Sequence, residues 1–172
     1  MPAQLFRSGV PFGTIFQFAG EKNQIPQGWL ACEGQELSRL TFPLLFEAIG
    51  TAWGGTGTPN FFIPDLRGMF LRGVSGDLST DPNKDDRDSP RKFLPGANPG
   101  NSGNNVGSVQ ADQIREHTHP IDNGCTDDNI GATMRGGIFA RSKGTGNTNL
   151  AGGKETRPVN AYIYFIIKAS SD

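Results

Sequence analysis

Hydrophobic residues are concentrated in residues 13–73 and near the C-terminus, while glycine and polar residues fill most of the chain between them. Alternating apolar positions predict a first strand over residues 13–19, in which Phe16 and Phe18 share a face. A second short strand is predicted over residues 28–32, because a Pro-Gln-Gly turn signal comes directly before it. The first hydrophobic stretch is therefore expected to begin with two strands.

The clearest strand pattern in the chain covers residues 157–168. Apolar side chains line one face and two tyrosines the other, as Val159, Ala161, Ile163, Phe165 and Ile167 against Tyr162 and Tyr164. A strand that is apolar on both faces is typical of the middle of a sheet. This strand is therefore predicted to be a central one.

One short helix is predicted over residues 41–50. Thr41 can cap its start, and Gly50 suits its end. The expected apolar face consists of Leu44, Leu45, Ala48 and Ile49. Residues 61–70, which come later, are predicted to be extended and interrupted by proline.

Two polar spans separate the hydrophobic stretches. Residues 74–107 mix aspartates with lysines and arginines and show no face that would be buried, so they are predicted to form a long surface loop. Residues 122–153 are similarly rich in glycine, asparagine and threonine. The composition thus divides the chain into residues 13–73, 74–107 and 108–172, preceded by residues 1–12, a candidate docking arm.

The composition narrows the fold class. Of 172 residues, 24 are glycine and 12 are proline, roughly a fifth of the chain against a usual share of about 12 %. This excludes a helical bundle and favours a mainly β protein with one short helix and long irregular loops. Only 35 % of the residues are hydrophobic, so we expect other chains to complete part of the core.

Charge and apolar runs exclude several function classes. The 16 basic and 17 acidic residues leave a net charge of −1, which argues against nucleic-acid binding. No apolar run is long enough to insert into a membrane, and the first residues lack the pattern of a secretory signal peptide. Cys32 and Cys125 are far apart in the sequence, so one disulfide and two buried thiols both remain open.

Sequence motifs of enzymes are incomplete in this chain. Lys154 is followed by Glu155, where a phosphate-binding loop needs serine or threonine. A calcium-type loop that starts at Asp81 has Asp86 in place of its turn glycine and Lys92 in place of its closing glutamate. We therefore expect that the protein is not an enzyme.

The two histidines of the chain are His117 and His119, which are separated by one residue. In an extended strand they project from the same face. Two imidazoles alone make a weak metal site, but three chains around a threefold axis would supply six, in an octahedral arrangement. Two solvated side chains, or a catalytic histidine beside Cys125 or an aspartate, are the alternative interpretations.

Five segments of the chain are notable for their order and spacing, namely Gly13–Ile15, Pro26–Gly34, Phe42–Gly50, Trp53–Gly55 and Phe62–Gly73. Together they resemble the phage tail collar domain of tail-fibre and microcystin-dependent-type proteins. Further along, Gln110–His119 and Glu155–Asn160 resemble the distal ends of contractile-tail fibres. Within the collar-like part, Trp29 is expected in the core, with a carbohydrate platform as the alternative. Asp65 and Arg67 are expected to hydrogen-bond locally across a tight bend.

The resemblance implies a homotrimeric, intertwined fibre end. It also implies that residues 13–73 form a collar-like α+β domain and that residues 108–172 form a metal-binding tip region. Carried onto this chain, the metal ligands are His117 and His119, with one Fe(II) or Zn(II) ion per trimer. Six nitrogen ligands favour iron, because structural zinc prefers four. No long repetitive shaft precedes the collar-like part, which indicates a short fibre or a terminal piece.

The expected function is adhesion of a phage tail fibre, or of a phage-like contractile injection device, to a host surface. The expected location is the virion tail or such an extracellular particle, after synthesis in the host cytoplasm. The expected partners are other tail or baseplate proteins and a cell-surface polysaccharide or outer-membrane receptor. Candidate receptor contacts are Asp122, Asn123, Asp127, Asp128, Asn129, Arg135, Asn147 and Asn149. One alternative is an adaptor between a baseplate and a longer fibre. The other is a polysaccharide depolymerase that uses two of Asp122, Asp127 and Asp128.

Overall fold

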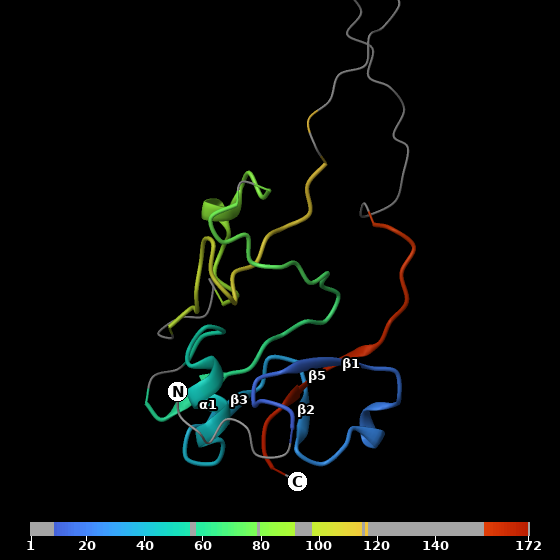
Figure 1. The fold of residues 1–172 in the computed structure, drawn as a ribbon, viewed down its shortest axis with the longest axis vertical. Helices are drawn as coiled ribbons and strands as arrows, with labels where there is room; N and C mark the ends of the chain where they lie inside the picture. Colours follow the sequence, from blue (N-terminus) through green and yellow to red (C-terminus); the bar gives the residue numbers. More distant parts are fainter. Residues whose placement is uncertain are drawn as a thin grey trace, which may run out of the picture. The chain divides into compact units, whose positions relative to one another are not determined.

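The computed structural model describes residues 9–55, 58–78, 80–91, 98–114, 116 and 157–171. The chain divides into two compact units, Met1–Ala111 together with Val159–Asp172, and Asp112–Pro158. All the helices and strands named below belong to the first unit. Figure 1 shows them along the chain.

The C-terminal strand β5 (Tyr164–Lys168) lies between two N-terminal strands. It pairs antiparallel with β1 (Ile15–Phe18) on one side and with β2 (Trp29–Ala31) on the other. Ile167 is opposite Ile15 in one pairing and opposite Leu30 in the other. The prediction of two early strands and a central C-terminal strand is therefore confirmed.

The C-terminal strand is shorter than its sequence pattern predicted. Residues 157–163 are not part of β5, and Val159 and Tyr162 are exposed in the single chain. The physical reason is the length of the partners, because β1 has four residues and β2 has three. Apolar alternation identified the face of the strand correctly, but it could not show where the paired neighbours end.

The helix α1 (Pro43–Ile49) was predicted in the right place, with a partly wrong face and a wrong cap. Leu45 is fully buried, but Ala48 is exposed and Leu44 is only half-buried. The side chains that pack on the core are Phe42, Leu45, Phe46 and Ile49, at the spacing of one helical face. The cap position is Phe42 and makes no side-chain capping hydrogen bond, so Thr41 does not cap the helix. Gly50 ends it with a positive φ of 53°, as predicted.

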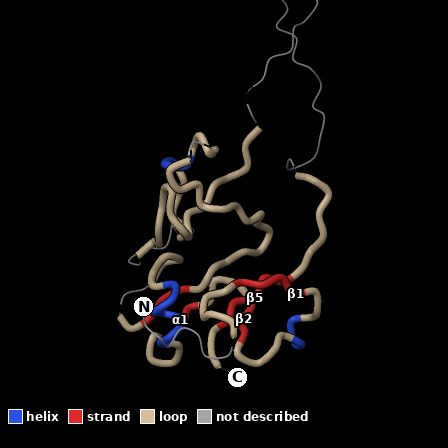
Figure 2. The backbone as a smooth tube through the Cα atoms, in the orientation of Figure 1, coloured by secondary structure: helices blue, strands red, loops and turns tan. Residues whose placement is uncertain are grey.

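A two-stranded antiparallel sheet completes the core. It consists of β3 (Glu36–Ser38) and β4 (Asn60–Phe62), and the sequence analysis did not predict β3. The Phe61 ring from β4 makes an edge contact with Phe46 from α1, with the ring centroids 5.3 Å apart. The buried cluster joins both sheets and the helix through Cys32, Leu45, Phe61, Ile63, Leu66, Ile167 and Ala169. The protein is thus mainly β with one short α-helix in its described part, as predicted (Figure 2).

Between β4 and β5, the described residues run largely as loops. The exceptions are the short 3-10 helix η2 (Lys84–Asp86) and residues of three isolated bridges, Glu33 with Asp65, Gly55 with Asn98 and Asp88 with Val109. A further 3-10 helix, η1 (Lys22–Gln24), follows β1. No buried face is predicted within residues 74–107, but the side chain of Asp81 in this span is only 5 % exposed. Among the described residues, no helix is long and apolar enough to cross a membrane.

Candidate functional site

The predicted metal ligands and receptor contacts lie outside the described residues. These are His117 and His119, and Asp122, Asn123, Asp127, Asp128, Asn129, Arg135, Asn147 and Asn149. In the part that the structure describes, no three histidine, cysteine, aspartate or glutamate side chains gather at a spacing that could hold a metal ion. The interpretation of these residues stays a prediction, as does the division of the chain into functional ranges.

Asp65 and Arg67 form a two-pronged ion pair just beyond β4. Arg67 Nε donates to Asp65 Oδ1 at 2.8 Å, and Nη2 donates to Oδ2 at 2.6 Å. The side-chain hydrogen bonds from Arg67 hold the pKa of Asp65 below its ordinary value, although partial burial opposes them. The sequence-based expectation of a local pair at this bend is confirmed. The carboxylate is therefore ionised and its guanidinium partner is fixed in orientation.

Arg91 fastens the long loop to the collar-like part. Its Nη2 donates to the carbonyl oxygen of Gly34 at 2.5 Å, and its Nε donates to that of Trp53 at 3.2 Å. The guanidinium also lies over the Phe62 ring. Burial lowers the pKa of Arg91, and the nearby charges of Asp65 and Glu36 oppose that effect. Sequence analysis did not single out Arg91, because its partners are far away along the chain.

A pocket of about 290 Å³ lies where these groups meet. Trp53, Ile63, Met69 and Pro90 supply its apolar lining. Asp65, Arg67 and Arg91 supply its charged lining. The Asp65–Arg67 bend and the long loop thus present one carboxylate and two guanidiniums beside an indole, in a hollow that could hold a small molecule.

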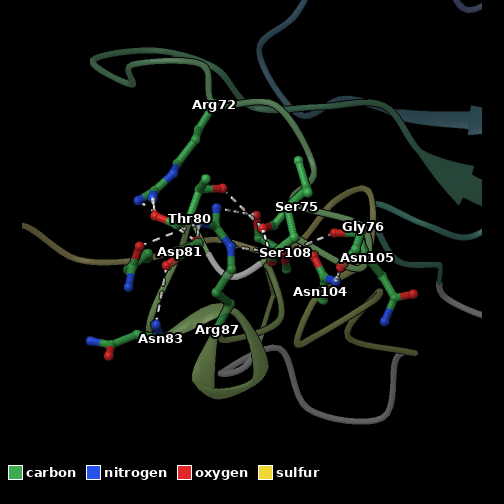
Figure 3. Close-up of polar contacts among 12 residues, drawn as sticks. Arg72, Ser75, Gly76, Thr80, Asp81, Asn83, Arg87, Asn104, Asn105 and Ser108 are labelled. Atoms are coloured by element: carbon green, nitrogen blue, oxygen red, sulfur yellow. Dashed lines mark hydrogen bonds and ion pairs between the residues drawn. The ribbon is translucent and has the colours of Figure 1, made fainter.

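A second polar cluster surrounds the buried Asp81 in the long loop (Figure 3). Asp81 Oδ2 lies 3.6 Å from Arg72 Nη1 and 3.4 Å from Arg87 Nη1, and Oδ1 accepts a hydrogen bond from the backbone N–H of Asn83. Arg87 donates further to the hydroxyl and the carbonyl oxygen of Ser108. Arg87 is mostly buried, and it also donates to the side-chain oxygen of Gln110. These contacts join residues 72–87 to residues 108–110.

Further hydrogen bonds stabilise the part of this loop that lies around Gly76 and Asn104. Asn104 Nδ2 donates to the carbonyl oxygen of Gly76 at 2.6 Å, and Ser75 Oγ donates to that of Leu78 at 2.7 Å. The backbone N–H of Gly103 donates to the backbone carbonyl oxygen of Arg87 at 2.8 Å. These groups satisfy one another, so the chemistry of this cluster is that of a folded scaffold for the loop and not of an open site.

Trp29 is half-buried, so the expectation that it belongs to the core is only partly met. Its ring stacks on the exposed ring of Phe16, with the centroids 5.2 Å apart, and the ammonium of Lys168 lies 5.6 Å from the indole centroid. Cys32 is buried and carries a free thiol, whose pKa is raised to about 12 by burial first and by the Asp65 charge second. Cys125 lies outside the described residues.

The helix α1, the strands β1 to β4 and the Asp65–Arg67 bend all lie within a segment that matches a known domain family. Residues 13–71 match the Phage Tail Collar Domain family, and the chain belongs to this family. Protein RhiB of Rhizobium leguminosarum bv. viciae is 31 % identical over 175 residues, covering 94 % of this chain and 75 % of that protein. The Short tail fiber protein gp12 of Enterobacteria phage T4 is 31 % identical over 189 residues.

The second similarity covers 92 % of this chain but only 35 % of the T4 protein, so the chain spans about a third of its length. The chain is therefore related to phage tail fibre proteins over nearly all of its own length. The expected resemblance to the tail collar domain is confirmed.

Proposed function

We propose that the chain forms the adhesive end of a homotrimeric tail fibre, carried by a phage or by a phage-derived injection device. The similarity to the T4 short tail fibre protein carries this proposal, because it extends over 92 % of the chain and not over the collar domain alone. The proposed location is the virion tail, or an extracellular particle of the same type. Adhesion without hydrolysis is part of the proposal.

Exposed apolar segments support self-association. Phe70 and Leu71 follow the Asp65–Arg67 bend and are 67 % and 55 % exposed in the single chain. Val159 and Tyr162, which precede β5, are almost fully exposed. Contiguous apolar residues of this kind are unusual on a monomer and are typical of surfaces that another chain covers. Three copies would bury them around a common axis.

Metal binding by His117 and His119 would cross-link such a trimer. Neutral imidazole nitrogens are suitable donors for both Fe(II) and Zn(II), and six of them fill an octahedral ion. A filled coordination shell leaves no position for a substrate, so the ion would be structural. Its binding would stabilise the assembly, since the ligands meet only when three chains have folded together.

Native mass spectrometry with elemental analysis tests the assembly and the metal together. We expect a trimer with one Fe or Zn ion per three chains. The double variant His117→Ala/His119→Ala should lose the ion and melt at a lower temperature, whereas Thr118→Ala should keep both, because residue 118 projects from the opposite face of an extended segment. The proposal would be contradicted if the wild-type protein were a metal-free monomer that melts at the same temperature as the double variant.

Adhesion is tested by binding the purified trimer to candidate host cells. We expect saturable binding that exceeds the binding of a single chain, because three weak contacts act together. A protein that binds another tail component but no cells would be an adaptor instead. Release of reducing sugar from host polysaccharide would indicate a depolymerase instead.

A further inference from the structure

The pocket beside the Asp65–Arg67 pair has the size of a small-ligand site. Its volume of about 290 Å³ equals roughly ten water molecules in the liquid. That space suits one small ring better than a peptide or an extended oligosaccharide. None of the residues that line it belongs to the receptor contacts predicted from the sequence, so the pocket is a separate candidate.

The lining offers an apolar surface for the face of a ring. Trp53 is half-buried, so part of its indole packs on the core and part is accessible. Met69 is 44 % exposed, and Pro90 adds a rigid apolar group beside them. An indole next to polar side chains is suited to ligands with an apolar face and a polar rim, since the tryptophan contributes large contact area at low entropic cost.

The charged groups face such a ring with both donors and acceptors. The Asp65 carboxylate accepts hydrogen bonds, and its lowered pKa means that it does so as an anion near neutral pH. Arg67 and Arg91 line the same pocket and can only donate. The sum of the three charges is positive, so an anionic ligand is favoured over a neutral one.

We infer that this pocket binds a single sugar ring that carries a carboxylate, such as a uronic acid unit. The apolar lining would contact the C–H face of the ring, Asp65 would accept from its hydroxyl groups, and the guanidiniums would bind its carboxylate. This inference names a class of ligand for the surface adhesion proposed above. Its biological role therefore rests on the proposed function. The pocket itself requires neither a trimer nor a metal.

Titration of the protein with methyl β-D-glucuronide, followed by the indole N–H signals in proton–nitrogen NMR spectra, tests the inference. The chain has two tryptophans, and Trp29 lies outside the pocket, so its signal is an internal reference. We expect the Trp53 signal to shift with a dissociation constant on the order of 1 mM, while the Trp29 signal stays in place. Methyl β-D-glucoside, which lacks the carboxylate, should bind about tenfold more weakly.

Arg67→Gln is the informative variant, because Arg67 is exposed and its loss leaves the core intact. We expect it to weaken glucuronide binding about tenfold with the melting temperature nearly unchanged. Lys22→Gln is the matched control, since Lys22 forms an exposed ion pair outside the pocket and its replacement should leave the affinity unchanged. Both variants retain Trp53, so ligand binding can still be followed by its indole N–H signal.

Three results would overturn the inference. One is an unshifted Trp53 signal at concentrations roughly tenfold above the expected constant. Another is an equal response to the glucoside. The third is an equal response to acetate, which would mean that the pocket attracts anions without recognising a ring. A negative titration would not contradict the proposed trimer or adhesion through residues 122–153. Conversely, a failure of the protein to bind cells would not change the result of the titration.

Discussion

The Cζ atom of Arg91 lies over the ring of Phe62, 3.7 Å from its centroid. This cation–π contact joins a residue of the long loop to a buried residue of β4. Together with the hydrogen bonds that Arg91 donates to Gly34 and Trp53, it explains how a loop with few apolar residues is held against the sheet.

Arg91→Ala should lower the free energy of unfolding by about 1–3 kcal/mol, because two charged hydrogen bonds and the ring contact are lost together. Arg91→Lys keeps the charge but not the planar fork, so it should recover less than half of that loss. Urea denaturation of the three proteins measures both effects. If lysine restored full stability, charge alone would be holding the loop and the contact geometry would be irrelevant.

Gly54→Ala should destabilise the protein by about 1–3 kcal/mol. The residue has a φ of +99°, and an added Cβ would lie 2.9 Å from the carbonyl oxygen of Asn98 and 3.0 Å from Arg91 Cδ. Gly73→Ala is the control, because Gly73 has no positive φ and an added Cβ there meets nothing within 4 Å. Thermal denaturation of both variants measures the difference. Equal melting temperatures would show that the loop does not pack closely on Gly54.

Asp81→Asn should loosen residues 72–110 by about 1–3 kcal/mol while leaving the sheet intact. Asparagine can still accept from the backbone of Asn83, but Arg72 and Arg87 lose their counter-charge. Hydrogen exchange should therefore accelerate in this loop and not in β1, β2 or β5. Asp85→Asn, a change at an exposed aspartate of η2, should alter neither region. Faster exchange throughout the chain would contradict a local role for Asp81.

Cys32 should make stability depend on pH in the alkaline range. Its pKa is about 12 in the folded chain, above the ordinary value of a thiol near 8.5, so folding favours the neutral form. That contribution is complete below the ordinary value and is lost as the pH rises toward 12, at up to roughly 1.4 kcal/mol per pH unit. In a Cys125→Ser background, denaturation between pH 8 and pH 10.5 should show this extra slope. Cys32→Ala should remove it, and an unchanged slope would contradict the buried, unionised thiol.

The features that sequence analysis predicted correctly depend on nearby residues. The strands β1 and β2, the helix α1 and the Asp65–Arg67 pair all follow from patterns within a few positions. Arg91 and Gly34 are 57 positions apart, and no local pattern connects them. Asp81 is one of several aspartates in its span, and only the positions of Arg72 and Arg87 decide that it is the buried one.

The central position of β5 has a consequence for biosynthesis. β1 and β2 emerge from the ribosome long before β5, and until it arrives each has an open edge of unpaired backbone groups toward the place that β5 will occupy. Such edges promote association with other nascent chains. A product truncated before residue 164 would therefore keep the collar segments but lose the strand that closes their sheet, and we expect it to aggregate. The order of translation thus delays the completion of this sheet until nearly all of the 172 residues have been synthesised.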